Sequence, residues 1–387
     1  MSVQPLPVHV DGLVFQQQPH GGISRNFTNL VNALARTPAT TPVLYLSKEC
    51  AWPRGMRAVE RREVPPPIRL RPARAFGRLA AAMTDRRSQR FWDSLGQGIF
   101  HSSYYSSPDG LRIPQVLSLQ DTIYEDFPNF FSSARHMAHL SDKRVAVERS
   151  SGLIFSSHFA RNRAYSHYEL GDRPVLVSPY AVDPVLLEEP TLEEVEAFRQ
   201  LHVQGRPFFL HVGSRYLHKN VAKLLEAWAG WRGDQDFVLL LAGGGAPEES
   251  ERLTLESDAL RGRVVVLPAL DETELRTAYR AAHAFVFPSL SEGFGFPLLE
   301  ALACGCPVAA ARAASLPEVG GDAPHYFDPG SVEDIRRALD AVALEQRTSA
   351  RWIAAQARAR SRDWSQVANE YSDFYRLVAD RHPSGRQ

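Results

Sequence analysis

Two glutamates bracket a glycine-containing loop in the second half of the chain. Gly293 and Gly295 lie between Glu292 and Glu300, and Pro297 follows the glycines. Proline suits the first turn of a helix, and a glycine loop that leads into a helix exposes free backbone N–H groups beside the positive end of the helix dipole. Such a turn can bind a phosphate, while the two carboxylates can bind hydroxyls on either side of it, such as those of a sugar ring and a ribose. In the structural alternative, Glu300 complements the helix dipole and Glu292 is a loop charge.

A second candidate site follows the apolar run 208–212. Arg215 and Lys219 stand four residues apart after this run, at the expected carboxyl end of a parallel strand, the edge where open α/β sheets bind ligands. Arginine can bind two phosphate oxygens at once, whereas lysine acts as a compact point charge. Together they can neutralise a diphosphate leaving group. The alternative is a surface pair at the end of a helix, although lysine is rare here, with only four in the chain.

The first half of the chain holds two further candidates. Gly21 and Gly22 stand directly before an expected helix, where glycines let the backbone approach a ligand closely. Gln120 and Asp121 follow an expected strand, so their side chains would face a cleft between domains. The structural alternatives are a plain strand-to-helix turn for the glycines and a turn or helix cap for Asp121.

The elements that must position these residues are short apolar runs that alternate with helical patterns. Many of the runs are continuously apolar and rich in Val, Phe and Leu, as in strands covered on both faces. The expected strands are 8–15, 43–46, 98–100, 116–119, 152–155, 175–177, 208–212, 237–241, 264–267, 284–287, 308–310 and 325–327. Apolar spacing over 27–34 and a capping box from Asp271 to Glu274 indicate helices between them. The alternation, in two blocks, predicts two doubly wound α/β domains with a boundary near 183–207.

The composition is that of an ordinary globular protein of about two domains. Of the 387 residues 44% are apolar, and basic and acidic residues number 44 each, so the formal net charge is zero. This balance argues against a protein that coats nucleic acid, which relies on excess positive charge. No apolar run approaches the ~20 residues of a membrane span, and no signal-peptide pattern opens the chain. Three cysteines cannot all pair, so a reduced, cytosolic compartment is expected.

Residues 54–90 carry an excess of arginine. Eleven arginines stand against three acidic residues there, a net charge of +8 in 37 residues. One interpretation is a solvated, mobile surface segment, with a helix over 73–83. The other is contact with an anion, either a membrane surface or a phosphorylated acceptor.

The motifs together resemble the family-4 retaining glycosyltransferases, or group 1 glycosyltransferases, of the GT-B fold. The hallmark is the pair Glu292 and Glu300, set in Ser-Glu-Gly-Phe-Gly-Phe-Pro-Leu-Leu-Glu-Ala-Leu-Ala-Cys-Gly-Cys-Pro-Val, and residues 212–220 match the family's diphosphate motif. The resemblance implies two Rossmann-like, doubly wound domains that face a central cleft. Residues 1–185 would form the acceptor-side domain and 186–362 the nucleotide-sugar-binding domain. A last helix within 363–387 would pack back toward the N-terminal domain.

The resemblance also assigns roles to individual residues. Arg215 and Lys219 would hold the donor diphosphate and stabilise the charge that builds on it as the glycosidic bond breaks. Glu292 would contact the donor sugar ring and Glu300 the nucleotide ribose. The remaining donor-binding positions are Gly21 and Gly22 at the phosphates, Ser214 in the diphosphate motif, Leu267 and Ala269 near the base, and Phe294, Gly295, Phe296 and Leu299 around the sugar.

Two positions depart from the family pattern. Family members commonly carry His-Asp where this chain has Gln120 and Asp121. Glutamine can hydrogen-bond a sugar hydroxyl but cannot exchange a proton near neutral pH, so we interpret Gln120 as a binding group in the catalytic region and not as a general base. The second departure is Tyr180, in Pro-Tyr-Ala where relatives usually have Pro-Asn-Gly, so the loop there is expected to differ in shape.

The sequence therefore predicts a retaining glycosyltransferase that moves a hexose of mannose or glucose type from GDP or UDP to an acceptor hydroxyl. The resemblance implies no metal and no other cofactor. We expect a glycan or lipid-linked acceptor in bacterial surface polysaccharide or glycoconjugate assembly, and no nucleic-acid partner. The expected location is cytoplasmic, with peripheral contact to the inner face of the membrane through 54–90. Two alternatives stay open: a non-catalytic nucleotide-sugar binder, and another GT-B enzyme such as a phosphorylase or a sugar-nucleotide epimerase.

Overall fold

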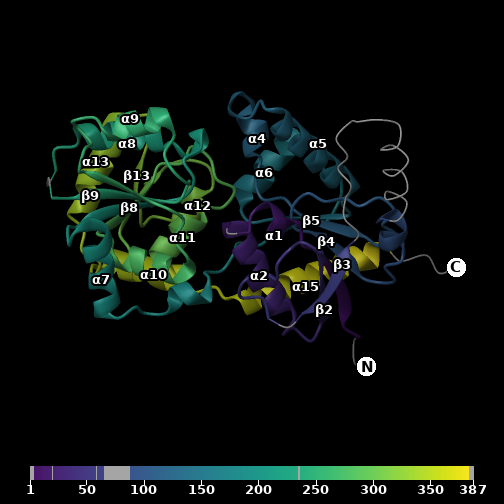
Figure 1. The fold of residues 1–387 in the computed structure, drawn as a ribbon. Coiled ribbons are helices and arrows are strands. Elements are labelled where there is room, and N and C mark those ends of the chain that lie inside the picture. Colours follow the sequence, from purple (N-terminus) through teal and green to yellow (C-terminus); the bar gives the residue numbers. More distant parts are fainter. Residues whose placement is uncertain (1–3, 20, 58, 65–87, 234–235, 383–387) are drawn as a thin grey trace.

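The computed structural model describes residues 4–19, 21–57, 59–64, 88–233 and 236–382. Over these residues the chain forms two parallel β-sheets with helices packed on them, one sheet in each of two lobes (Figure 1). We call these the first and the second lobe, after their order in the chain.

The first lobe is built on the strand order β3-β2-β1-β4-β5-β6-β7, and neighbouring strands pair in parallel. The order reverses between β1 and β4, as in doubly wound sheets. The strands are β1 (Leu6–Asp11), β2 (Thr40–Ser47), β3 (Glu60–Val64), β4 (Ile99–Ser102), β5 (Gln115–Ser118), β6 (Gly152–Phe155) and β7 (Val175–Val177). The helices are α1 (Leu13–Gln17), α2 (Gly22–Leu34), α4 (Ile123–Asp126), η1 (Pro128–Phe130), α5 (Ala134–Arg149), α6 (His158–His167) and η2 (Pro184–Leu187).

The second lobe has the strand order β10-β9-β8-β11-β12-β13, again parallel throughout. Its strands are β8 (Phe208–Val212), β9 (Val238–Ala242), β10 (Val264–Leu267), β11 (Ala284–Phe287), β12 (Val308–Ala311) and β13 (His325–Phe327). Its helices are α7 (Leu192–Val203), η3 (Leu217–Lys219), α8 (Val221–Gly230), α9 (Glu249–Leu255), α10 (Glu272–Ala281), α11 (Phe296–Ala303), α12 (Leu316–Gly320), α13 (Val332–Ala343) and α14 (Ala350–Ala359). The predicted capping box of α10 is present, with Asp271 and Glu274 bonding each other's backbone. Strands are found at all twelve predicted places, eleven of them with small shifts at their ends. The prediction over 8–15 is wrong in its second half, because β1 ends at Asp11 and residues 13–17 form α1.

One strand corrects the prediction for the arginine-rich segment. β3 pairs with β2 at the edge of the first sheet, within the part of 54–90 that we predicted to be a mobile surface segment. Its side chains are almost all exposed. β3 is an edge strand that is covered on neither face, and such a strand does not need alternating apolar residues. Its charged sequence therefore lacks the hydrophobic pattern from which the other strands were predicted. The helix predicted over 73–83 lies outside the described residues.

The last helix, α15 (Trp364–Arg381), returns from the second lobe and packs on the first, beside α2 (Figure 1). A capping box between Asp363 and Gln366 starts it. Trp364 donates a hydrogen bond from Nε1 to the Val182 carbonyl at 3.0 Å, and Tyr371 and Tyr375 are fully buried. Among the described residues, no helix combines the length and the apolar character that a membrane span requires.

Buried histidines should make the fold sensitive to acid. Burial lowers the pKa of His101 to about 3 and that of His211 to about 4. Because the unfolded chain binds these protons near pH 6.5, the stabilisation is complete above that pH and is lost as the pH falls toward 4. We expect each histidine to cost about 2 kcal/mol of unfolding free energy between pH 7 and pH 5. Urea unfolding should show a shallower pH slope in His211→Asn. The exposed His158→Asn should keep the wild-type slope, and equal slopes in all three proteins would contradict the assignment.

Candidate functional site

The two predicted loops of the second lobe are joined in the structure. Lys219, at the end of η3, places its Nζ 2.7 Å from Oε1 of Glu292, which lies in the loop after β11. Asn220 follows in the left-handed conformation and donates from Nδ2 to the carbonyls of Pro288 and Pro329. The loop after β8 is therefore held against the loop after β11, and the lysine and the glutamate of the two motifs form an ion pair.

Arg215 is fixed by a glycine turn that follows β9. Its guanidinium donates to the carbonyls of Gly243 and Gly245 and forms an ion pair with Glu251 at 2.5 Å. Both glycines have positive φ angles, which glycine adopts without the steric cost of a side chain. Gly243 also donates its N–H to the carbonyl of Leu267, so the turn connects Arg215 with the segment predicted to meet the nucleotide base.

The loop between β11 and α11 is fixed by its own lobe. Ser315 donates to the carbonyls of Glu292 and Phe294, each at 2.9 Å. Gly295 has a φ of 96° and is the N-cap of α11, so the positive end of this helix dipole lies at the loop. In the first turn Pro297 has no N–H, and Leu298 donates its N–H to the Gly295 carbonyl at 3.0 Å. The remaining predicted positions of this lobe are Ser214 between β8 and η3, Ala269 exposed after β10, and Leu299 buried in α11.

Glu300 is paired across the two lobes. Its Oε1 lies 2.8 Å from Nη2 of Arg25 on α2, and its Oε2 accepts from the Tyr279 hydroxyl at 3.0 Å. The negative charge of Glu300 raises the pKa of Arg25 above its usual value. The carboxylate is 4% exposed, so the first lobe supplies the counter-charge of a buried acid in the second lobe.

The predicted residues of the first lobe meet the second lobe at the same junction. A Cβ atom on Gly22 would lie 3.6 Å from the Phe296 ring, and one on Gly293 would overlap the carbonyl oxygen of Gln120. Ser157 donates to the carbonyl of Gly293 at 2.6 Å. The start of α2 at Gly22 and the turn at Gln120 after β5 therefore both lie against the second lobe, beside the loop between β11 and α11 and the first residue of α11.

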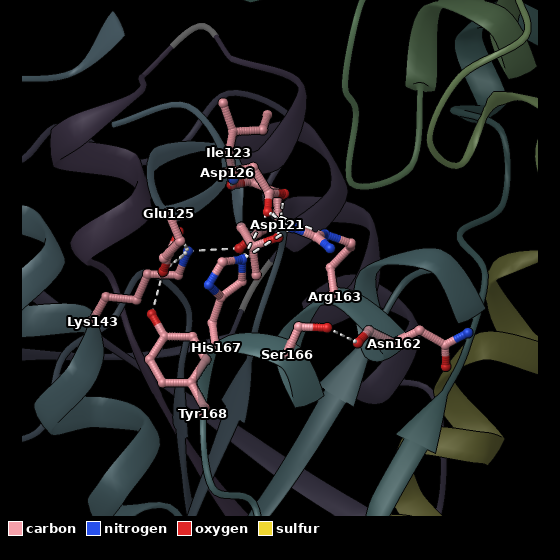
Figure 2. A network of polar contacts seen from close by, with 11 residues as sticks. Asp121, Ile123, Glu125, Asp126, Lys143, Asn162, Arg163, Ser166, His167 and Tyr168 are labelled. Carbon is pink, nitrogen blue, oxygen red and sulfur yellow. Dashed lines mark hydrogen bonds and ion pairs between the residues drawn. The ribbon is translucent and has the colours of Figure 1, made fainter. Parts of the chain in front are cut away.

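Asp121 begins a turn that a polar network holds in place (Figure 2). Its Oδ1 accepts from the N–H of Ile123 at 3.1 Å, which is the turn-cap alternative considered above. Lys143 donates to the Asp121 carbonyl at 2.6 Å and pairs with Glu125 at 2.8 Å. Lys143 is 1% exposed, so this ion pair ties the turn to α5 from inside the lobe.

The far end of the same turn is anchored to α6. Asp126 accepts from Thr122 at 2.8 Å and forms ion-pair contacts with Arg163 and His167 (Figure 2). With charged contacts at both ends, the turn that follows Gln120 has little freedom to change its shape.

Sequence reasoning missed four side chains of this junction: Arg25, Lys143, Tyr180 as a contact of Gln120, and Tyr279. Two of them carried a signal. Arg25 stands three residues after the predicted Gly22, and the scarcity of lysine that drew attention to Lys219 applies equally to Lys143.

Comparison with known proteins points to one family. Residues 193–359 match the family model described as glycosyl transferases group 1. The chain is 33% identical over 299 residues to O-antigen chain mannosyltransferase B of Escherichia coli, an alignment that covers 72% of this chain and 74% of that protein. It is 29% identical over 246 residues to the serotype-specific mannosyltransferase WbdA of Escherichia coli, which covers 61% of this chain but only 30% of WbdA. The chain thus spans less than a third of the length of that relative.

The fold is also found among solved structures. WaaG, a glycosyltransferase involved in lipopolysaccharide biosynthesis, superposes with a TM-score of 0.72 at 18% identity, over 96% of this chain and 99% of that one. At this identity the likeness concerns the fold, and it confirms the predicted α/β architecture of GT-B type.

Proposed function

The chain belongs to the group 1 glycosyltransferases, and on that premise we propose that it transfers a hexose of mannose or glucose type from a nucleoside diphosphate to an acceptor hydroxyl, with retention of configuration. In this proposal residues 1–185 receive the acceptor and 186–362 bind the nucleotide sugar. The relatives named as an O-antigen chain mannosyltransferase and a serotype-specific mannosyltransferase favour a glycan acceptor in surface polysaccharide assembly.

The observation that carries the proposal is the contact between Lys219 and Glu292 at the N-terminus of α11. A lysine held there can exchange its carboxylate partner for a diphosphate oxygen, and Arg215 and the N-terminal end of the α11 dipole add positive potential nearby. As the bond between the sugar C1 and the phosphate oxygen breaks, charge builds on the diphosphate. The acceptor oxygen forms the new bond on the same face, and its proton passes to the departing phosphate oxygen. We propose that these residues suffice without a metal.

A nucleotide screen combined with a transfer assay tests the proposal. Thermal unfolding is measured with UDP, GDP, ADP and their sugars, since a ligand that binds only the folded chain raises the melting temperature. We expect one nucleoside diphosphate to stabilise the protein and its hexose derivative to be consumed when a mannose- or glucose-terminated glycan is added. Stabilisation without transfer to any glycan would favour the non-catalytic binder. Phosphate-dependent release of hexose phosphate would favour a phosphorylase, and conversion of the sugar while still bound to nucleotide would favour an epimerase.

We also propose that residues 54–90 bring the protein to an anionic membrane surface. Their net charge of +8 supports this, and β3 places the start of the segment at an exposed sheet edge. Co-sedimentation with vesicles that contain anionic lipid should exceed that with neutral vesicles and fall with added salt. Equal sedimentation with both kinds of vesicle would contradict this contact.

The pair Arg25–Glu300 leads to a prediction about nucleotide binding. If Glu300 binds ribose hydroxyls, Arg25 holds its carboxylate charged and in place. Arg25→Ala should therefore raise the KM for the donor about tenfold, because a buried charge that loses its partner costs more than 1 kcal/mol, and Arg25→Lys should recover part of the loss. Arg36→Ala, exposed just beyond the end of α2, is the control. Steady-state kinetics would contradict the prediction if Arg25→Ala left KM unchanged.

A further inference from the structure

The two positions at which the sequence departs from the family pattern touch each other. Tyr180, which replaces the usual Asn, donates from its hydroxyl to Oε1 of Gln120, which replaces the usual His, at 2.9 Å. Both side chains are buried, and the Tyr180 ring also packs against Phe294 and Phe296 of the second lobe. The two departures are therefore one paired change at the junction of the lobes.

The contact with Tyr180 uses the oxygen of the Gln120 amide and leaves its nitrogen without a hydrogen-bond partner. Nε2 of Gln120 is buried and makes no hydrogen bond to the described residues. A buried donor that stays unpaired destabilises the folded chain, so an oxygen atom of a ligand bound at this junction would relieve a penalty that the chain already carries. The backbone carbonyl of Gln120 adjoins Gly293, next to the predicted sugar-binding Glu292, and the Tyr180 ring that contacts the amide packs on the predicted sugar-binding Phe294 and Phe296.

Behind Tyr180, a chain of buried polar groups leads to α15. Tyr375 of α15 bonds Nδ1 of His101 at 2.8 Å, and Nε2 of His101 lies 2.9 Å from the Ser118 hydroxyl. Tyr371 of α15 places its ring beside that of His101, with the centroids 6.0 Å apart. The buried polar groups behind the junction are therefore covered by the helix that closes the chain on the first lobe.

The Tyr180 contact also assigns the two ends of the Gln120 amide. The Tyr180 hydroxyl has one proton and donates it to Oε1, so Oε1 is the acceptor end and the unpaired Nε2 is the donor end of the amide.

We propose that Tyr180 is a positioning residue, which holds the Gln120 amide with its nitrogen toward the bound sugar so that Nε2 donates a hydrogen bond to a sugar oxygen. This inference rests on the proposed function. The Tyr180 hydroxyl prevents the amide from turning over, so the site presents a fixed donor where a histidine would present a group that changes its protonation.

Binding and kinetics of four variants test the inference. Gln120→Glu keeps the shape of the side chain but replaces the donor by an acceptor oxygen, and Tyr180→Phe releases the amide. By calorimetry we expect both to weaken binding of the nucleotide sugar about tenfold, the size of one lost hydrogen bond, and to leave binding of the nucleoside diphosphate unchanged. Because Tyr180 acts through Gln120, the double variant Gln120→Ala with Tyr180→Phe should be no worse in kcat/KM than Gln120→Ala alone.

A matched control is Tyr45→Phe. Like Tyr180, Tyr45 is a buried tyrosine whose hydroxyl contacts a buried polar side chain, here His9 at 2.9 Å, but the pair lies on β2 and β1. Its loss should lower stability without changing sugar binding. Additive effects of Gln120→Ala and Tyr180→Phe, or full sugar binding by Gln120→Glu, would overturn the inference while transfer by the wild type upholds the proposed function. Absence of any transfer by the wild type would remove both.

Discussion

Lys219→Ala is expected to lower kcat by a factor of about 100 to 1,000 while the protein still folds. In the ligand-free chain Lys219 neutralises Glu292 and is only partly exposed, with 17% of its side-chain surface accessible. When a diphosphate binds, the same ammonium group would face the oxygen on which charge accumulates, in a site where few water molecules screen it. Lys219→Arg should retain part of the activity, because arginine keeps the positive charge but spreads it over a planar guanidinium group.

The matched control for Lys219 lies four residues further along the chain, on the helix that follows η3. Lys223 is another of the four lysines and lies on α8, which begins directly after the diphosphate loop. Lys223→Ala should leave kcat close to that of the wild type. The readouts are initial rates at saturating donor, with circular dichroism to show that each variant folds. Near-normal turnover by Lys219→Ala and by Arg215→Ala would show that these two cations do not stabilise the departing diphosphate.

Much of the fold could be predicted because its glycines, prolines and helix-capping residues act within short segments of the sequence. The loop from Glu292 to Pro297, the capping box at Asp271 and the continuous apolar strands each express their structure within about ten residues, so a local pattern is sufficient. The carboxyl ends of parallel strands share one edge of a sheet, which is why Lys219 and Glu292 could be expected near each other although 73 residues separate them.

Contacts between the lobes could not be predicted in the same way. Arg25 meets Glu300 across 275 positions and Ser157 meets Gly293 across 136, and neither segment carries a pattern that identifies its partner. The same holds within the first lobe, where Tyr180 meets Gln120 across 60 positions. A single sequence also cannot show that two unusual residues compensate each other, because each departure appears alone. β3 was missed for a different reason: its hydrogen bonds come from β2, while its own side chains remain in water.

Gly293→Ala is expected to abolish most of the transfer activity, because the added methyl group prevents the two lobes from lying as close together as they do in the structure. The three atoms nearest to an added Cβ all belong to Gln120 and Asp121 of the first lobe, and the Asp121 Cβ would be only 2.9 Å away. The backbone of a Gly293 variant is not otherwise strained, since this glycine is not among those with positive φ. The second lobe can therefore fold with alanine here, but the junction cannot close as it does in the structure.

The consequence is a variant that folds and binds nucleotide yet fails to transfer sugar. We expect kcat to fall at least a hundredfold, because a displacement of about 1 Å at a reacting centre already costs that much. Thermal unfolding should change little, and small-angle scattering should report a larger radius of gyration. Gly96→Ala, a first-lobe glycine with open space around its Cβ position, is the control and should match the wild type in all three measurements. Full activity of Gly293→Ala would mean that transfer takes place with the lobes farther apart than they are here, and that Gln120 acts on the sugar from a greater distance than the contact with Gly293 implies.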